Sequence, residues 1–454
     1  MLRNILLCLL LVNVVTKQAF PQASHVILIS IDGFRPQMYL DPSWPAANLR
    51  YLMHAGVYAD HMLSVFPAYT YPSHTAMVTG ALPARSGIYF NQPKNGNGQW
   101  DWYASSIRVP TLWRILKARG LTTAAFQWPL SAMDSITFSV PEIFDIRHPD
   151  DRITLTRHYA TPGLLEEIEQ NATGRLDSSN MTEEYFSVDD QSARMAAYVF
   201  ETRKPAFLAI HLPSVDGKEH EDGPDSDSVR LALEASDHDI GLLLEAVKRS
   251  GLQDSTAIII VGDHGMSEIH KAFRPNLLLQ GIAARFVASG GSAFLYPTDS
   301  GKIYPSQQLA DKVIKALDKL PADNRKLFRV IGRSELNKMG ADSTAILALA
   351  ATPGLVFTGA VKSATVVNNG PGTVIQQNPL AGVFYPVHGG HHGYDPKLPE
   401  MYTGFIAAGA GIRKGAKIEE LCVTDIAPLV AKLLGVAFKT PDGKLVSEIF
   451  LSPK

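Results

Sequence analysis

The sequence has few cysteines. Only Cys8 and Cys422 occur in 454 residues, and Cys8 lies in an N-terminal segment that we expect to be removed. Cys422 is then alone, which excludes an internal disulfide in the mature chain. Exported eukaryotic proteins commonly carry disulfides, so their absence favours a bacterial periplasm as the compartment.

An excess of charge of one sign is also lacking. The chain has 42 Lys and Arg against 44 Asp and Glu, a formal net charge of −2. This balance predicts no nucleic-acid-binding patch and no attraction to an anionic membrane. Beyond the N-terminal segment, no apolar run reaches the roughly 20 residues of a transmembrane helix. Repeats of fixed period and low-complexity tracts are missing too, so the composition indicates a globular protein with a large core.

The first 23 residues have the order of a secretory signal peptide. Arg3 and the amino terminus precede a mostly apolar run from Ile5 to Val15, and small residues follow. That run is too short to span a bilayer, and the order is typical of export signals. A buried N-terminal helix is the alternative interpretation. We expect residues 1–23 to be cleaved and residues 24–454 to form a secreted or periplasmic catalytic domain.

Short runs rich in β-branched residues recur along the remaining chain. The first, His25 to Ile31, has the continuous apolar character of a strand buried on both faces. Helix-like stretches such as Ser228 to Arg249 and Thr111 to Arg119 lie between later runs. Strands that alternate with helices predict an α/β fold with a doubly wound, mostly parallel sheet. The other strand-like runs are Thr122 to Phe126, Ala206 to Ile210, Ala257 to Val261 and Thr403 to Ala407.

The pattern changes between about Pro275 and Val387. Two strand-like runs, Ala293 to Leu295 and Leu327 to Ile331, flank a helix-like stretch from Gln307 to Leu320. We expect a small α+β subdomain inserted at about residues 275–387. The acids and histidines on either side of it must then meet in space.

Acids and histidines follow several of the predicted strands. In an open parallel sheet, the carboxyl ends of the strands form the edge where ligands bind. A single aspartate there is more commonly a turn or a helix cap, so only the combination predicts a site. Carboxylates and imidazoles together suit two divalent metal ions, most of all Zn²⁺. The residues concerned are Asp32, Asp216, His220, Asp263, His264, His391 and His392.

A candidate nucleophile lies just before Pro72. Proline suits the first turn of a helix, because its missing N–H would be unpaired there. Thr70 and Tyr71 are therefore expected at a helix start, where free N–H groups and the helix dipole bind phosphate. A metal bound to the Thr70 hydroxyl would lower its pKa and make it nucleophilic. The alternative is that Thr70 is only a helix N-cap, and His74 is interpreted as structural or exposed.

Several short motifs occur in a fixed order along the chain. They are Asp32-Gly33, Thr70-Tyr71-Pro72-Ser73-His74, Val78-Thr79-Gly80, Asn91, Trp128-Pro129, Asp216-x-x-x-His220, Asp263-His264-Gly265-Met266 and His392-Gly393-Tyr394-Asp395. In this order they resemble the nucleotide pyrophosphatase/phosphodiesterase family of the alkaline phosphatase superfamily, over nearly the whole chain from about residue 25. One departure is Ser73, where family members that act on nucleotides commonly carry Asn. This departure weakens the expectation of a nucleotide substrate more than that of a hydrolase.

The resemblance implies an alkaline phosphatase-like fold and a metal-dependent hydrolase of phosphodiester or pyrophosphate bonds. Thr70 would form a phosphothreonine intermediate, while Asn91 and Tyr71 would bind substrate, the Asn91 amide donating to a non-bridging phosphate oxygen. Two Zn²⁺ ions are the implied cofactors. The ligands implied for one are Asp216, His220 and His392, and for the other Asp32, Thr70, Asp263 and His264.

Other activities stay open. A phosphomonoesterase would need more positive charge near the phosphate, and the sequence does not fix where Arg35, Lys94 and Lys218 point. A sulfatase that makes its nucleophile from cysteine is disfavoured because no Cys-x-Pro-x-Arg motif occurs. A phosphoglycerate mutase is disfavoured by Thr70 and by the export signal. A catalytically inactive binding protein is disfavoured because all the implied metal positions carry competent residues.

The expected partner is a small-molecule phosphate ester, either a nucleotide or a lipid head-group diester. Five aromatic residues are candidates for stacking on a base, and each is equally suited to the core. The sequence leaves open the leaving group, Mn or Fe in place of one Zn²⁺, and the oligomeric state. The five residues are Tyr69, Tyr71, Tyr89, Phe90 and Trp128.

Overall fold

A computed structural model describes residues 22–94, 99–182, 186–298, 306–360 and 382–451. Its centre is an eight-stranded sheet, in which only β15 runs antiparallel to its neighbours. The predicted doubly wound, mostly parallel α/β sheet is confirmed, and the expected strands lie within two residues of their predicted bounds. In sheet order the strands are β16 (Ala416–Cys422), β2 (Val57–Leu63), β15 (Phe405–Gly409), β6 (Thr256–Gly262), β1 (His25–Ile31), β5 (Phe207–Leu212), β3 (Thr123–Phe126) and β4 (Phe138–Val140).

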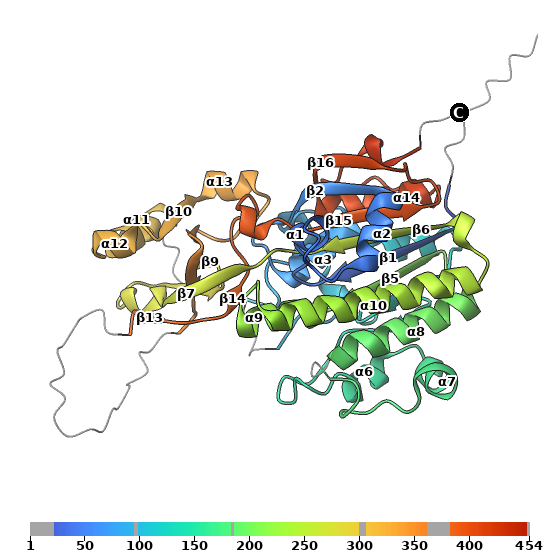
Figure 1. Cartoon of the computed structure of the whole chain (residues 1–454). Helices are drawn as coiled ribbons and strands as arrows, with labels where there is room; N and C mark the ends of the chain where they lie inside the picture. The colour runs from blue at the N-terminus through green and yellow to red at the C-terminus, as the bar shows by residue number, and fades with distance from the viewer. Residues whose placement is uncertain (1–21, 95–98, 183–185, 299–305, 361–381, 452–454) are drawn as a thin grey trace, which may run out of the picture.

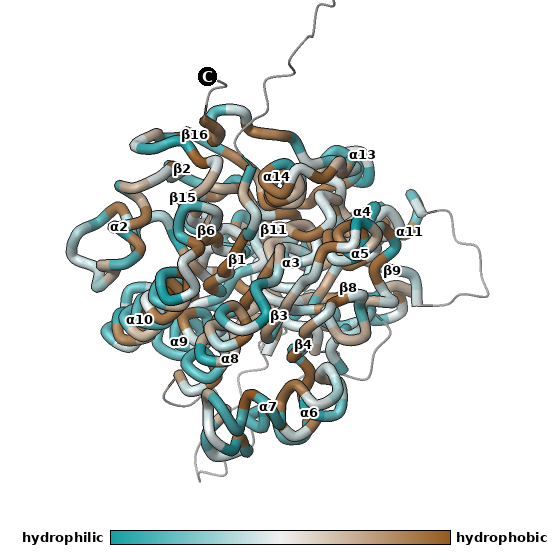
Figure 2. The backbone as a smooth tube through the Cα atoms, turned by 90° about the vertical axis from the view of Figure 1, so that its right-hand side faces the viewer, coloured by the Kyte–Doolittle hydropathy of each residue, from teal (hydrophilic) through white to brown (hydrophobic). Residues whose placement is uncertain are grey.

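Strand β1 shows why the sheet lies between two helical layers. Val26 and Leu28 belong to one apolar cluster, and Ile27 and Ile29 belong to another on the opposite face. Both faces are fully buried, as the unbroken apolar run predicts. Figure 2 shows the apolar strands inside and hydrophilic residues on the outer helices. One layer contains α2 (Ala47–Ala55), α8 (Ser187–Arg203) and α10 (Asp227–Arg249), and the other contains α3 (Thr70–Thr79), α5 (Leu112–Lys117) and α14 (Ile426–Leu433).

A smaller body lies beside the carboxyl-end edge of the central sheet (Figure 1). It contains two further sheets, with strand orders β10-β11-β9-β8 and β12-β7-β13. Strand β7 comes before the expected boundary at residue 275 and yet pairs with β12 and β13 inside this body. The strands are β7 (Ser267–Phe273), β8 (Ala284–Ser289), β9 (Ser292–Pro297), β10 (Phe328–Gly332), β11 (Leu347–Ala351), β12 (Gly354–Phe357), β13 (Phe384–Pro386) and β14 (Gly390–His391).

Further helices complete the described chain, and none of its helices is long and apolar enough to cross a bilayer. The proposed signal peptide falls almost entirely in residues 1–21, outside the described residues, as does Cys8. Cys422 is a free thiol. The remaining α-helices are α1 (Gln37–Leu40), α4 (Pro83–Ser86), α6 (Thr154–Tyr159), α7 (Leu164–Ile168), α9 (Ser214–Asp222), α11 (Ser306–Leu317), α12 (Ala322–Arg325) and α13 (Arg333–Lys338).

A buried carboxyl group between α8 and α10 makes stability depend on pH. Burial, and then the nearby Asp189, raise the pKa of Asp239 to about 9. The folded state therefore keeps a proton that the unfolded state loses near pH 4, and stability falls by up to about 1.4 kcal/mol per pH unit between those values. Asp239→Asn should match the wild type near pH 4 and be more stable at pH 9. Urea unfolding at pH 4, 7 and 9 tests this, with Asp190→Asn as a neighbouring control. If the free energy of unfolding of Asp239→Asn fell with pH as steeply as that of the wild type, the prediction would be contradicted.

Candidate metal centre and active site

The strand register brings the predicted acids together. Ile31 at the end of β1 pairs with Leu212 on one side and with Gly262 on the other. Because the three strands are parallel, the residues that follow them emerge at the same edge. Asp32 and Asp263 are the next residues after two of these strand ends.

Asp32, Asp263 and His264 form one buried group of potential metal ligands. Nε2 of His264 lies 3.3 Å from Oδ1 of Asp32 and 3.2 Å from Oδ2 of Asp263. Burial and the neighbouring Asp216 raise the pKa of Asp263 to about 7, and burial with Asp263 raises the pKa of Asp32 well above its usual range. In both, burial and neighbouring acids disfavour the charged carboxylate, the form that a bound cation would stabilise.

Beside this first group, the other predicted ligands are shared between two overlapping groups, Asp216 with His264 and His392, and His220 with His391 and His392. Asp216 lies near the start of α9, and its two carboxylate oxygens are 3.4 Å from Nε2 of His220 and 4.0 Å from Nε2 of His392. The His264 and His392 rings stack with centroids 3.7 Å apart. This stack joins them to the first group, so the structure brings all six predicted Asp and His ligands to one place.

Backbone carbonyls select the tautomer of three histidines. Nδ1 of His220, His264 and His392 donates to the carbonyls of Gly390, Gly265 and Ala68, at 2.9, 3.1 and 2.9 Å. A neutral imidazole has one N–H, so the tautomer that donates from Nδ1 has its lone pair on Nε2, the atom that faces the cluster.

A second observation also supports a divalent-metal site at this cluster. Among the described residues, Oδ1 of Asp32 and Oδ2 of Asp263 are buried and accept no hydrogen bond. Burial also lowers the pKa of His264 and of His392 well below the usual value, which keeps both in the neutral, ligating form. Buried carboxylate oxygens and neutral Nε2 atoms are the donors that Zn²⁺ takes.

Thr70 is the first residue of α3 and is 6% exposed. Its Oγ1 lies 3.3 Å from Nε2 of His264, so the hydroxyl is beside the Asp32 group. Tyr69 before it is extended, which ends the preceding loop and starts the helix there. His74 is buried one turn later and donates Nδ1–H to the Thr70 carbonyl at 2.8 Å, a structural role that fits its interpretation.

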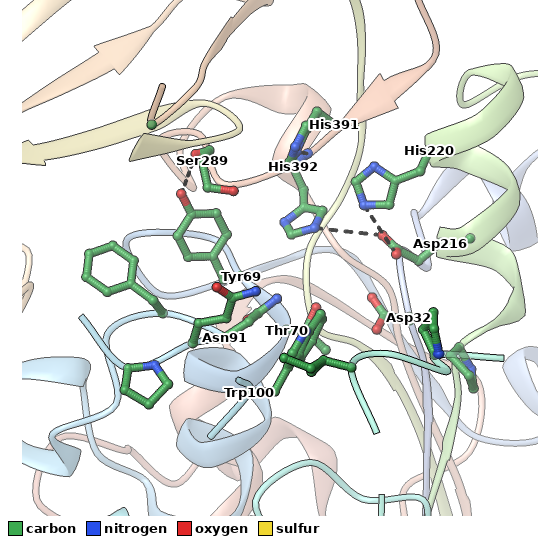
Figure 3. Close-up of a pocket in the computed structure, with 18 of the residues that line it drawn as sticks. Asp32, Tyr69, Thr70, Asn91, Trp100, Asp216, His220, Ser289, His391 and His392 are labelled. Atoms are coloured by element: carbon green, nitrogen blue, oxygen red, sulfur yellow. Dashed lines mark hydrogen bonds and ion pairs between the residues drawn. The ribbon is translucent and has the colours of Figure 1, made fainter. Parts of the chain in front are cut away.

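Asn91 and Tyr71 have different positions relative to the cavity. Oδ1 of Asn91 accepts the Tyr71 N–H at 3.0 Å, which leaves the Asn91 amide N–H groups as donors beside Thr70 (Figure 3). The ring of Tyr71 is fully buried, and its hydroxyl donates to Glu142. The expected free N–H of Tyr71 is therefore occupied, and Tyr71 orients Asn91 because the helix start needs a partner for that N–H.

A cavity of about 1030 Å³ opens over Thr70 and the metal-ligand groups. Figure 3 shows Thr70, Asn91 and the histidines around it. Of the aromatic residues considered for base stacking, Tyr69 and Phe90 line the cavity, whereas Tyr71, Tyr89 and Trp128 are not among its lining residues. Trp100 and Phe144 add apolar wall on the far side.

The three basic residues near the motifs each form an ion pair. Arg35 pairs with Glu219, Lys94 with Asp342 and Lys218 with Glu221, at N–O distances of 2.9, 2.7 and 2.6 Å. Of the three, only Lys94 lines the cavity.

Sequence reasoning missed other polar residues of the cavity. His211 bonds to Oδ2 of Asp32 at 2.9 Å and to the Gln127 carbonyl at 3.1 Å, and Arg152 lies 3.7 Å from Glu142. All are buried, and no local motif marks them. His391 is different, because the sequence analysis already placed it among the candidate acids and histidines, and it groups with His220 and His392.

Comparisons with known proteins identify the family. Residues 26–395 match the family described as type I phosphodiesterase / nucleotide pyrophosphatase. Mouse ectonucleotide pyrophosphatase/phosphodiesterase family member 3 is 26% identical over 54% of the chain, which spans only about a quarter of that relative's length (25%). Rat family member 7 is 23% identical over 93% of the chain and 86% of the relative.

Solved structures show the same fold. An inactive threonine-to-alanine variant of murine ectonucleotide pyrophosphatase/phosphodiesterase 5, in complex with AMP, superposes with a TM-score of 0.67 at 20% identity. The match covers 93% of this chain and 97% of that one. The human counterpart gives a TM-score of 0.66.

Proposed function

The chain belongs to the type I phosphodiesterase / nucleotide pyrophosphatase family of the alkaline phosphatase superfamily, and on that basis we propose that it hydrolyses phosphodiester or pyrophosphate bonds with Thr70 as nucleophile and two Zn²⁺ ions as cofactors. The observation that carries the proposal is the position of Thr70. Its hydroxyl lies 3.3 Å from His264 at the start of a helix, inside a buried group of acids and histidines. A threonine that served only as a helix cap would not need acids and histidines around its hydroxyl.

Each residue has a role in this proposal. Asp216, His220 and His392 would hold one metal, and Asp32, Asp263 and His264 would hold the other beside Thr70. The metals would lower the pKa of the hydroxyl and offset the charge on the phosphoryl group. Oγ1 of Thr70 would attack phosphorus as one ester oxygen leaves, and water would later cleave the bond between Thr70 and phosphorus. With a diester substrate, the intermediate keeps the second ester group on phosphorus. The Asn91 amide donates to a non-bridging oxygen, an interaction worth about 3 kcal/mol in comparable sites.

The substrate we propose is a small phosphate ester, with a nucleotide as the first choice. The related murine protein binds AMP, and Phe90 and Tyr69 offer aromatic surface close to Thr70. A lipid head-group diester is the alternative within the same reaction class. Arg152 favours phosphomonoester hydrolysis as a second candidate activity, because a buried guanidinium in the same cavity suits a dianionic phosphate.

The reaction class is tested with two chromogenic esters. The zinc-loaded protein should cleave bis(p-nitrophenyl) phosphate with a higher kcat/KM than p-nitrophenyl phosphate, since the proposed metals would offset the charge of one phosphoryl group and the cavity has room for two substituents. A preference for the monoester would identify a phosphatase instead. If neither ester is cleaved while two metals are bound, the inactive binding protein is the better interpretation.

We also propose export to the periplasm, with cleavage near residue 23. The order of charge, apolar run and small residues at the N-terminus supports this. N-terminal sequencing of the protein from a bacterial periplasmic fraction should begin near Ser24, and an intact Met1 would contradict cleavage.

A further inference from the structure

A buried ion pair connects the two metal-ligand groups. Nε of Arg35 lies 2.9 Å from Oε1 of Glu219, and the side chains are 7% and 0% exposed. Arg35 follows Asp32 by three residues, whereas Glu219 lies on α9 between Asp216 and His220. The pair therefore joins the loop that carries one ligand group to the helix that carries the other.

Arg35 holds this geometry with further contacts on the segment after α9. Its guanidinium donates to the carbonyl of Pro224 and lies 3.2 Å from Oδ1 of Asp225. A planar guanidinium with several fixed acceptors has one orientation. The end of α9 is thus fixed relative to the loop after β1.

Gly33 extends the contact to Asp263, in the group that also contains Asp32 and His264. Its φ of +71° suits glycine, and a β-carbon there would overlap the free side of the Glu219 carboxylate. The Gly33 N–H donates to Oδ1 of Asp263 at 3.1 Å. A shift of Glu219 would therefore move Gly33 and, through it, the orientation of Asp263.

We propose that the Arg35–Glu219 pair couples the two metal sites, so that the two Zn²⁺ ions bind cooperatively. A metal held by Asp216 and His220 fixes α9, and with it Glu219, which lies between these two residues. Glu219 then fixes Arg35 and Gly33, which orients Asp32 and Asp263 for the other metal. Coupling of this kind is reciprocal, so either metal favours the other. The inference rests on the proposed two-metal site, and both residues act as positioning residues without touching substrate.

Zinc titration of the metal-free protein against a chromophoric chelator tests the coupling. The wild type should bind two Zn²⁺ per chain in one transition. The double variant Arg35→Met/Glu219→Leu keeps the buried volume and removes both charges, a replacement that buried pairs commonly tolerate. It should still bind both ions, but in two transitions whose midpoints differ by about tenfold or more.

A matched control uses a pair away from the cavity. Arg114 and Asp134 are also 2.9 Å apart, and Asp134 is buried. Arg114→Met/Asp134→Leu should keep the single transition. Circular dichroism and the thermal unfolding midpoint establish that each variant is folded. Should the first double variant not fold, Glu219→Gln, which keeps the side-chain shape, is expected to show a smaller separation.

The outcomes separate this inference from the proposed function. Two separated transitions in the wild type, or a single one in the folded Arg35 and Glu219 variants, would overturn the coupling while leaving a two-metal hydrolase intact. Equal splitting in the control pair would also overturn it. A wild type that binds no zinc would instead remove the proposed function on which the coupling depends.

Discussion

Thr70→Ala is expected to lower kcat on bis(p-nitrophenyl) phosphate by at least about 10³-fold. The proposed reaction passes through a bond between Oγ1 of Thr70 and phosphorus, and alanine has no atom that can form it. Thr70 is one of four ligands proposed for its metal, and Asp32, Asp263 and His264 remain in place. We therefore expect the variant to bind two Zn²⁺ ions and to keep its fold. Steady-state kinetics, together with zinc content, check this expectation.

Thr70→Ser is the matched control. Serine keeps a hydroxyl at the start of α3, so activity should stay within about tenfold of the wild type, a small loss beside that of alanine. Acid quenching during turnover should trap, in both active proteins, a peptide containing residue 70 that carries the phosphoryl group with its remaining p-nitrophenyl ester. An alanine variant that retains most of the activity would show that water attacks the ester directly, and Thr70 would then not be the nucleophile.

The central sheet was predictable from the chain because its strands are continuous apolar runs. His25–Ile31 is buried on both faces, and no amphipathic helix has that pattern. Strand β2 (Val57–Leu63) was not predicted, because Asp60 and His61 interrupt its apolar character. It pairs with β16 near the edge of the sheet, where partial exposure allows charged residues.

The proximity of the candidate metal ligands was predictable for a related reason. Asp32 and Asp263 directly follow predicted strands, and parallel strands end at one edge, so local sequence already implied their proximity. His211, Arg152 and Glu219 carry no such mark. Their importance comes from contacts with residues elsewhere in the chain. His211 contacts Asp32 across 179 positions, Arg152 contacts Glu142 across 10, and Glu219 contacts Arg35 across 184. Only tertiary packing creates those neighbours.

Tyr71 illustrates a limit of motif reasoning. Its place beside Thr70 correctly implied a helix start, but not the partner that its N–H would find. Asn91 lies twenty positions later and accepts that N–H. The same contact that occupies the Tyr71 N–H directs the Asn91 amide toward the cavity. Both residues were expected to bind substrate, but Tyr71 instead orients Asn91.

Removal of the metals is expected to abolish hydrolysis and to destabilise the fold. Chelation should reduce the rate to the uncatalysed background, and zinc should restore it. Zinc at about 1000 times its Kd adds about 4 kcal/mol of stability per site by mass action, so the unfolding midpoint should rise by several degrees. Differential scanning calorimetry with and without chelator measures the change.

The stabilisation by zinc should grow with pH. Without metal, the folded pKa of Asp263 is about 7, above its unfolded value near 4. The metal-free fold thus loses stability from this group as pH rises between those values, whereas the zinc-bound carboxylate carries no proton to lose. Asp263→Asn should reduce zinc binding to one ion. Asp395→Asn, in the His392 motif but paired with Arg329, should keep two. Equal zinc content in both variants would place the metal elsewhere, and a zinc effect that shrinks with pH would contradict a carboxylate ligand with a raised pKa.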